Sequence, residues 1–366
     1  HDYKTNGFVD GLLFSSYLCD VKSMPNIREL TFDQLSETIA GLGEKSFRAK
    51  QIYDWLWNKS ARSFDQMNNV PLVLRNKLAE TFAFTPIVVA HEQRSSDRTI
   101  KYGFKLHDDY LIEGVLIPTA SRMTACVSSQ VGCSLSCKFC ATGKLDRVRN
   151  LNADEIYDQV AIIREQSMEV YNIPLSNIVY MGMGEPLLNY ANVISSIERI
   201  TSANGLGMSP QRITVSTAGI AKMINKLGDD EVKFNLALSL HAANDSKRDK
   251  IMPINEHNNL DVLRDALKYF YDKTGTRVTY EFIVFNNFND SLKDAQELAE
   301  FAKHVPCKIN LIEYNAIGDG FFEKARLDRL EIFKNYLESK NLVVNIRRSR
   351  GKDIDAACGQ LANKNQ

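Results

Sequence analysis

The chain has 366 residues, of which 44% are hydrophobic and 25% are charged, a composition typical of a globular protein with one large domain and a smaller one. Its 45 Lys and Arg residues balance 45 Asp and Glu residues, so no overall basic bias marks it as a nucleic-acid-binding protein. Seven cysteines, three of them in one short motif, indicate a reducing compartment rather than a disulfide framework. No apolar run approaches the roughly 18 residues of a membrane span, and the first residues lack the pattern of a signal peptide. We therefore expect a cytoplasmic protein without membrane contact.

Residues 1–23 show no clear period, whereas helical patterning begins after Met24, in Leu30, Phe32, Leu35 and Ile39. We interpret residues 1–23 as an extension and assign no role to Cys19 within it. Residues 24–95 are predicted to form a small helical accessory domain.

Residues 45–57 of that domain mix basic and aromatic side chains on one expected helix. An amphipathic core helix explains the apolar stripe formed by Ile52, Trp55 and Leu56. Lys50 points away from that stripe and is free to meet a phosphate, whereas Arg48 and Lys59 fall on it and are available only at the helix ends. RNA binding and a purely structural role both remain open for this domain.

Residues 86–118 alternate apolar and polar positions around a turn at His107, Asp108 and Asp109, which predicts strands. From residue 125 onward, strand and helix patterns alternate. The candidate strands are 125–131, 177–183, 211–217, 233–240, 277–285, 307–313 and 342–347. The candidate helices are 153–170, 190–203, 260–274, 290–304 and 324–339, and Asn152 with Glu155 is a plausible cap of the first.

This alternation predicts an α/β fold with a parallel sheet and right-handed crossovers. About six βα units indicate a partial (βα)6-type barrel over residues 96–350, with leading strands as an extension. The working face of such a barrel is the carboxyl end of its strands. Residues 351–366 are left as a C-terminal tail.

Cys133, Cys137 and Cys140 form a CxxxCxxC motif that small residues follow at once. A closed zinc site needs a fourth Cys or His, and none stands nearby in sequence. Three thiolates on a four-iron cluster leave one iron open, and that iron can chelate the amino and carboxylate groups of S-adenosylmethionine (SAM). The spacing therefore looks like the radical SAM signature, with buried structural cysteines or a zinc site completed by a distant His as alternatives.

Glycines and polar residues recur where the expected strands end. Gly182 and Gly184 let backbone approach a ligand closely, and Glu185 can accept a hydrogen bond from an ammonium group. Further candidates at later strand ends are Ser216, Ser239, Leu240, His241 and Asn315. Each alone is more readily explained as a turn or cap residue, but their repetition at strand ends favours ligand binding.

Two cysteines stand apart from the motif: Cys126 precedes it, and Cys358 lies between polar residues and Gly359 near the C-terminus. A free cysteine is commonly an inert small apolar residue, which suits Cys307 in its apolar strand. Cys358 is poorly placed for core packing. Its thiolate would be favoured by the nearby basic residues Arg347, Arg348, Arg350 and Lys352.

Together these features resemble the RlmN family of radical SAM RNA adenine methyltransferases, of which Cfr is a near relative. The matching stretches are residues 126–133, the cysteine motif with Phe139, residues 182–186, residues 239–241 and residues 348–360. The resemblance extends from about Met24 to Leu361 in the family's order.

The resemblance implies that Cys133, Cys137 and Cys140 hold a [4Fe-4S] cluster. It implies that SAM is bound by Gly184, Glu185, Ser216, Ser239, Leu240, His241 and Asn315. It assigns catalytic roles to Cys358, Cys126 and Glu113, the last as a proton acceptor.

In the implied reaction, Cys358 first takes a methyl group from one SAM. A second SAM, cleaved reductively at the cluster, gives a 5′-deoxyadenosyl radical that removes hydrogen from that methyl group. The resulting methylene radical adds to an electron-poor carbon of adenine, a site that direct transfer from SAM cannot methylate. Cys126 then attacks the sulfur of Cys358, which forms a disulfide and releases methylated RNA.

The implied substrates are an adenine of 23S rRNA at the peptidyl-transferase centre and an adenine of tRNA 3′ of the anticodon, both methylated at C2. The base must be exposed or flipped out of its stack. The implied protein is a monomer that takes electrons from a donor such as flavodoxin or ferredoxin. A local basic rim could be formed by Lys144, Arg147, Arg149, Arg212, Lys247, Arg248 and Lys250, with an ordinary solvated surface as the alternative.

Two other functions remain possible from the sequence. A Cfr-type enzyme would use the same chemistry at C8 of adenine, although Val131 before Gly132 looks like the C2 branch. A non-catalytic iron–sulfur protein that binds RNA is the alternative from another class. Cys358 argues against it, because binding alone needs no such thiol.

Overall fold

The computed structural model describes residues 24–318 and 320–363. The extension expected at residues 1–23, with Cys19, lies outside the described residues. No helix in the part of the chain that the structure describes is long and apolar enough to cross a membrane.

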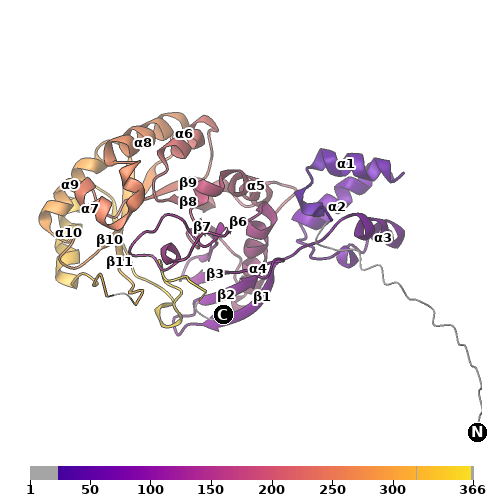
Figure 1. The fold of residues 1–366 in the computed structure, drawn as a ribbon, viewed down its shortest axis with the longest axis horizontal. Coiled ribbons are helices and arrows are strands. Elements are labelled where there is room, and N and C mark those ends of the chain that lie inside the picture. The colour runs from indigo at the N-terminus through magenta and orange to yellow at the C-terminus, as the bar shows by residue number, and fades with distance from the viewer. Residues whose placement is uncertain (1–23, 319, 364–366) are drawn as a thin grey trace, which may run out of the picture.

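Ten strands form one sheet, in the order β1-β2-β3-β4-β7-β8-β9-β10-β11-β12 (Figure 1). Three leading strands are antiparallel: β1 (Val88–Arg94), β2 (Ile100–Lys105) and β3 (Leu111–Pro118). The strands that follow run parallel: β4 (Met123–Cys126), β7 (Asn177–Tyr180), β8 (Ile213–Thr217), β9 (Asn235–Ser239), β10 (Val278–Val284), β11 (Cys307–Glu313) and β12 (Val344–Arg347). The predicted α/β fold is confirmed, with a partial barrel and a leading strand extension.

The strand expected at 125–131 is wrong beyond Cys126. After that residue the chain leaves the sheet, and β5 (Gln130–Val131) pairs instead with β6 (Arg149–Asn150). The backbone N–H groups of Ser129 and Gln130 donate to Met183 O, at 2.9 and 3.2 Å, so the hydrogen bonds of a continued ladder are taken by a loop.

The expected crossover helices are present as α4 (Ala153–Tyr171), α5 (Tyr190–Thr201), α8 (Leu260–Thr274), α9 (Leu292–Ala302) and α10 (Leu327–Ser339). At the start of α4, the Glu155 carboxylate accepts from the backbone N–H of Asn152 at 2.9 Å, as the capping pattern predicted. Two short helices, α6 (Ala221–Asp229) and α7 (Asp245–Ile251), were not expected. With nine and seven residues, each is too short for a clear helical period in the sequence.

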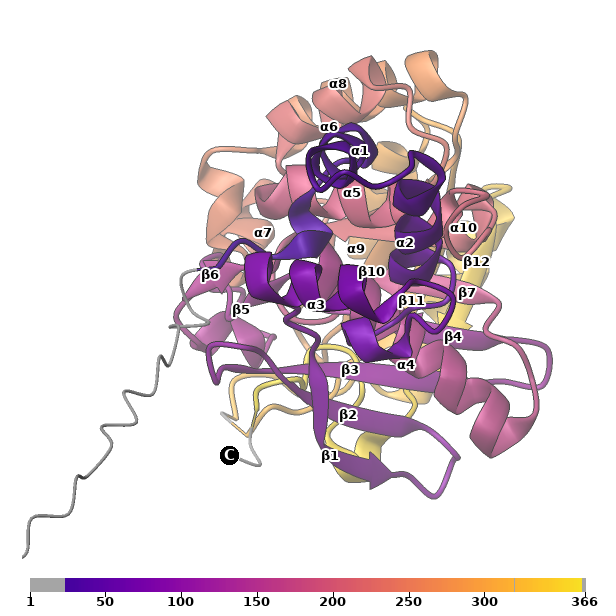
Figure 2. The same cartoon turned by 90° about the vertical axis from the view of Figure 1, so that its right-hand side faces the viewer.

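The N-terminal region is helical, with α1 (Phe32–Gly41), α2 (Phe47–Trp57) and α3 (Leu72–Thr81), and it lies to one side of the barrel (Figures 1 and 2). The predicted stripe on α2 is buried at Ile52 and Leu56 and partly buried at Trp55. Lys50 is exposed, as expected. Lys59 lies beyond the end of α2, where it pairs with Asp54 and covers the Trp55 ring.

Buried charges join this helical region to α4. The Arg28 guanidinium pairs with Asp158 at 2.6 Å and with Asp154 at 3.0 Å, and all three side chains are buried. Tyr157, between the two aspartates, packs edge-on against the Trp57 ring. Removing one member of such a buried ion-pair group is costly, because it strands the opposite charge.

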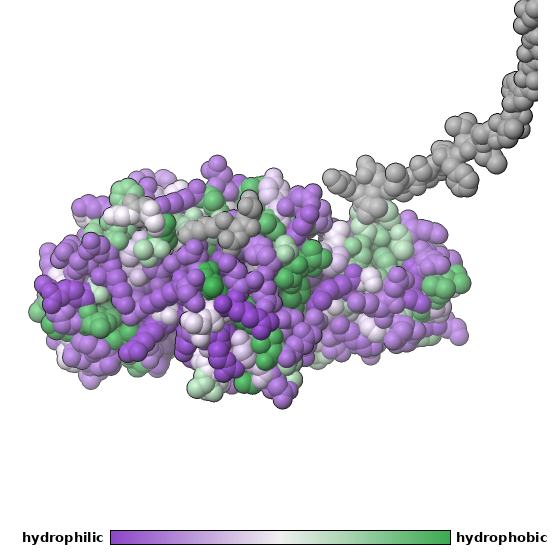
Figure 3. Space-filling model, turned by 90° about the horizontal axis from the view of Figure 1, so that it is seen from below, coloured by the Kyte–Doolittle hydropathy of each residue, from purple (hydrophilic) through white to green (hydrophobic). Residues whose placement is uncertain are grey.

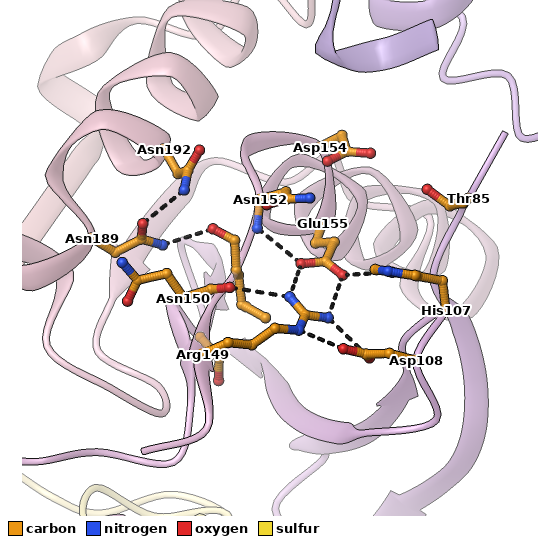
Figure 4. Close-up of polar contacts among 12 residues, drawn as sticks. Thr85, His107, Asp108, Arg149, Asn150, Asn152, Asp154, Glu155, Asn189 and Asn192 are labelled. Carbon is orange, nitrogen blue, oxygen red and sulfur yellow. Dashed lines mark hydrogen bonds and ion pairs between the residues drawn. The ribbon is translucent and has the colours of Figure 1, made fainter. Parts of the chain in front are cut away.

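A second polar group fixes the β2–β3 turn against α4 (Figure 4). Arg149 donates to Asp108 at 2.6 Å and to Glu155 at 2.7 and 2.8 Å, so its guanidinium lies between two carboxylates. His107 Nδ1 lies 3.3 Å from Glu155 Oε1. Polar side chains otherwise dominate the face drawn in Figure 3, with only scattered apolar patches.

Candidate active site

A cavity opens at the carboxyl ends of the parallel strands, the edge where a βα barrel binds ligands. Its lining includes the three motif cysteines, strand-end residues from β7 to β12, and part of the C-terminal tail. The lining residues that the sequence predicted are Cys133, Cys137, Cys140, Gly184, Glu185, Ser216, Ser239, His241 and Cys358. Side chains far apart in the sequence thus meet around one hollow.

The loop of the three motif cysteines is packed against the strand ends. Lys138 N donates to Ile251 O at 2.9 Å, and the Phe139 ring packs edge-on against His241, 4.6 Å between centroids. At Gly143 a Cβ would come within 2.8 Å of Cys137 O, so this turn has no room for a side chain. The loop therefore holds its thiols in fixed places facing the cavity.

The donor set fits an iron–sulfur cluster. Burial raises the pKa of each thiol, to about 11 for Cys133, so the thiolates need a compensating positive charge. Within residues 24–318 and 320–363, no three His, Cys, Asp or Glu side chains lie close enough to hold a single metal ion. Each of the three thiolates can bind a separate iron of a cubane cluster, which supplies the compensating charge.

The turn after β7 approaches Gln130 closely. Gly184 has φ +95°, and a Cβ there would come within 2.5 Å of Gln130 Cβ. Glu185, which follows, accepts from Ala218 N at 2.7 Å and from Leu187 N at 3.1 Å. Burial raises the pKa of Glu185 to about 7, so an ammonium group from a ligand would stabilise its carboxylate.

Two serines and a histidine follow on β8 and β9. The hydroxyls of Ser216 and Ser239 lie 3.4 Å apart, side by side on neighbouring strands. Burial, with the charge of Arg248 nearby, lowers the pKa of His241 to about 3, so its imidazole is neutral. His241 Nδ1 accepts from Ile283 N at 3.1 Å, which leaves Nε2 to carry the proton.

Two predicted ligand contacts are not among the residues that line the cavity. Leu240 is fully buried, and its carbonyl oxygen accepts from Arg248 Nε at 3.2 Å. The Asn315 side chain donates to Cys358 O at 3.2 Å, so it faces the tail. Their assignment to SAM stays a prediction.

Cys126 ends β4 and is not among the residues that line the cavity, whereas Cys358 on the tail is. Burial raises the pKa of the Cys126 thiol to about 12, and the charge of Cys358 adds to the rise. Cys126 is buried, whereas Cys358 is exposed. The Arg347 guanidinium donates to Glu281 at 3.2 Å, and its charge favours the thiolate of Cys126.

Glu113 lies elsewhere, on β3 beneath the tail. It is completely buried, its Oε1 lies 3.1 Å from Lys101 Nζ, and its Oε2 accepts from Ala362 N at 2.9 Å and from Asn363 N at 3.2 Å. It is not among the cavity-lining residues. The expected role as a proton acceptor stays a prediction that this placement does not favour.

The basic rim is smaller than predicted. Arg149 is held between two carboxylates, Lys247 pairs with Asp294, and Arg248 is fully buried with backbone carbonyls and Asn255 as partners. Arg212 precedes β8, at the opposite end of the strands. Of the other members, Lys144, Arg147 and Lys250 are exposed, and Lys144 and Arg147 line a neighbouring hollow that shares Cys133 and Gly143 with the cavity.

Glu281 is a cavity residue that the sequence reasoning missed. It is an acidic residue in the middle of a wholly buried strand, β10, and a buried carboxylate needs a partner. A single acidic residue within this otherwise buried strand was the sequence signal that could have identified Glu281 as a site residue. Asn310 supplies one hydrogen bond at 2.8 Å and Arg347 another.

Family models match two parts of the chain. Residues 25–83 match the ribosomal RNA large subunit methyltransferase N-terminal domain, and residues 127–302 match the radical SAM superfamily. The second match contains the three motif cysteines, and the first covers the N-terminal helices.

Similar proteins cover nearly the whole chain. A probable dual-specificity RNA methyltransferase RlmN of Cytophaga hutchinsonii is 60% identical over 92% of this chain and 93% of its own. A dual-specificity RNA methyltransferase RlmN of an Anaeromyxobacter species is 42% identical over 92% and 90%. The crystal structure of a radical SAM methyltransferase from Sphaerobacter thermophilus superposes with a TM-score of 0.87, at 37% identity, covering 92% of this chain and 99% of that one.

Proposed function

The chain belongs to the RlmN family of radical SAM RNA methyltransferases, and from that membership we propose that it methylates C2 of adenine in 23S rRNA and in tRNA. The proposed sites are the peptidyl-transferase centre and the adenine 3′ of the anticodon. The observation that carries the proposal is that the exposed thiol of Cys358 lines the same cavity as the three motif cysteines.

The family's cofactors are a [4Fe-4S] cluster and SAM, which together supply the methyl group and one-electron cleavage of SAM. We assign the cluster to Cys133, Cys137 and Cys140 and the SAM amino group to the Glu185 carboxylate. Gly184, which has no side chain, would let SAM approach the turn closely. Ser216, Ser239 and His241 would offer hydrogen-bonding groups to SAM. Leu240 and Asn315 complete the assignment taken from the family.

Cys358 is the proposed methyl carrier, and Cys126 the proposed resolving thiol. The Cys126 thiolate would attack Cys358 Sγ, so that the S–S bond forms as the bond from Cys358 Sγ to the methylene carbon breaks; the electron pair of that bond goes to the adenine side, where the carbon takes up a proton and becomes the methyl group. The electrostatic coupling of the two thiols supports this pairing. Arg347 would favour the thiolate of the attacking Cys126, whose burial otherwise disfavours it.

We further propose a cytoplasmic monomer that takes electrons from flavodoxin or ferredoxin. The proposed division is residues 1–23 as an extension, 24–95 as an RNA-binding accessory domain, 96–350 as the barrel with its leading strands, and 351–366 as the carrier-bearing tail; in the structure β1 (Val88–Arg94), at the end of the second segment, pairs with β2 and so belongs to the sheet. The exposed residues Lys144, Arg147 and Lys250 are the candidates for RNA phosphate contacts.

Nucleoside mass spectrometry tests the function. Unmodified rRNA and tRNA are treated with the anaerobically reconstituted protein, SAM and a reductant, and the digests are compared with authentic standards. The appearance of 2-methyladenosine supports the proposal and identifies the RNA. The alternative is methylation at C8 of 23S rRNA, in which case 8-methyladenosine appears instead.

A further inference from the structure

The tail that bears Cys358 is held by hydrogen bonds along residues 351–363, at its start, in its middle and at its end. At its start, Asp97 Oδ2 accepts from Gly351 N at 2.9 Å, and the Asp353 carboxylate accepts from Ser95 Oγ at 2.5 Å. Ser95 and Asp97 belong to the turn between β1 and β2. The leading antiparallel strands therefore hold the start of the tail.

The middle of the tail is fastened to the loop of the motif cysteines. Gly359 O accepts from Ala141 N at 2.7 Å, and Leu361 O accepts from Thr142 Oγ at 2.6 Å. The residues after β11 hold this part as well, because the Asn315 side chain donates to Cys358 O and the Gln360 side chain donates to Ala316 O, both at 3.2 Å.

The end of the tail is held by a buried ion pair in the leading strands. Lys101 and Glu113 lie diagonally across the β2–β3 ladder, since Lys101 pairs with Val115, two residues beyond Glu113. Glu113 Oε2 accepts from two successive backbone N–H groups, those of Ala362 and Asn363. The Asn363 side chain also donates to Leu111 O at 2.7 Å.

We propose that Lys101 and Glu113 form a latch that positions Cys358, so that Glu113 is a positioning residue rather than the proton acceptor. A buried ion pair gains little over apolar residues of the same volume, so stability alone does not account for one at this place. The geometry of the pair accounts for it. Lys101 Nζ holds Glu113 through Oε1, while Glu113 Oε2 accepts the hydrogen bonds from the tail. A general base must reach the proton it removes, whereas Glu113 has no solvent exposure and lines no part of the cavity.

Two double variants distinguish a positioning role of Glu113 from a role as general base. The inference rests on the proposed role of Cys358 as the methyl carrier. Lys101→Gln with Glu113→Gln keeps a neutral acceptor for the tail but removes the carboxylate. Lys101→Met with Glu113→Leu removes the acceptor without leaving a buried charge. Lys105→Met is the matched control. Lys105 lies on the same strand β2, and the change removes its exposed ion pair with Asp109.

Hydrogen exchange of the anaerobically reconstituted protein, followed by mass spectrometry, reports on the latch without reference to catalysis. We expect amide exchange in residues 359–363 to quicken at least about tenfold in the Met/Leu variant and to stay near wild type in the Gln/Gln variant and the control. Unchanged exchange at β10 and β11 verifies that each variant is folded. Unchanged tail exchange in the Met/Leu variant overturns the latch.

Methylation of Cys358, read from the mass of its peptide after incubation with SAM, completes the test. We expect the Gln/Gln variant to methylate Cys358 and RNA within about threefold of wild type, and the Met/Leu variant to lose at least about tenfold in both. A Gln/Gln variant that methylates Cys358 but accumulates RNA-linked protein overturns the positioning role and restores the base. Wild-type protein with a protected tail but no methyl group on Cys358 rejects the carrier function and leaves the latch standing.

Discussion

Cys126 and Cys358, 232 positions apart in the sequence, lie close enough for the charge of Cys358 to raise the pKa of the Cys126 thiol. One thiol is buried at the end of β4 and the other is exposed on the tail. The buried thiol has its pKa raised to about 12, mainly by burial. Two thiols so differently placed are suited to different steps of one reaction.

Replacing each of these cysteines should therefore give a different failure. Cys358→Ala should abolish methylation of RNA, because no carrier remains, while the cluster spectrum and SAM binding are kept. Cys126→Ala should accumulate protein linked to RNA, visible as a slow band with labelled RNA on a denaturing gel. Cys307→Ala, a change at the amino end of β11, is the control and should turn over normally. Free release of product by Cys126→Ala would remove its resolving role.

Glu185→Gln should weaken SAM binding by about 10- to 100-fold, because a charge-assisted hydrogen bond to the ammonium group becomes a neutral one. Calorimetry with SAM measures this loss. Glu300→Gln, at an exposed ion pair on α9, should bind SAM as wild type does. Equal affinity in the Glu185 variant would place the ammonium group elsewhere.

The same carboxyl should make stability depend on pH. Its pKa is raised from 4.5 to about 7 by burial, so the folded state binds a proton more tightly than the unfolded state does. The stabilisation is fully present below about pH 4.5 and is lost as pH rises through about 7, amounting to roughly 3 kcal/mol at most. Urea unfolding of the ligand-free protein at several pH values should show this dependence, and Glu185→Gln should flatten it. A wild-type profile without that dependence would contradict the raised pKa.

Arg28→Ala should lower the free energy of unfolding by roughly 3–5 kcal/mol, because it leaves Asp154 and Asp158 buried without a counter-charge. Arg62→Ala is a matched control, since Arg62 joins the same helical region to α4 through a partly exposed pair with Glu165. That change should cost about 0–1 kcal/mol. Urea midpoints compare the two variants, and equal losses would argue against a buried junction.

Gly184→Ala should destabilise the turn after β7 by about 2 kcal/mol or more and weaken SAM binding. The added methyl group would overlap Gln130, in addition to the strain of a positive φ. Gly207→Ala has a positive φ too, but no atom lies within 4 Å of its added Cβ, so it isolates the backbone term of about 1 kcal/mol. The two variants should differ in thermal stability; indistinguishable melting would exclude the predicted overlap.

The sequence predicted the barrel well because its strands are apolar runs that end in polar residues, as in Ser239 and His241. Because the motif spacing is local, the sequence also predicted that Cys133, Cys137 and Cys140 lie together, and they line one cavity; their role as ligands stays a prediction. It could not predict that Glu113 binds Ala362, because 249 positions separate them and no periodicity links the two. The basic rim was overestimated for the same reason: the carboxylates that hold Arg149 come from distant elements.

The attachment of the tail to the leading strands has a consequence for biosynthesis. The strands β1–β3 and the cysteine loop leave the ribosome long before residues 351–363, which are the last of the described residues to be made. The tail can therefore become ordered only after partners made much earlier, such as Asp97, Ala141 and Glu113, have folded.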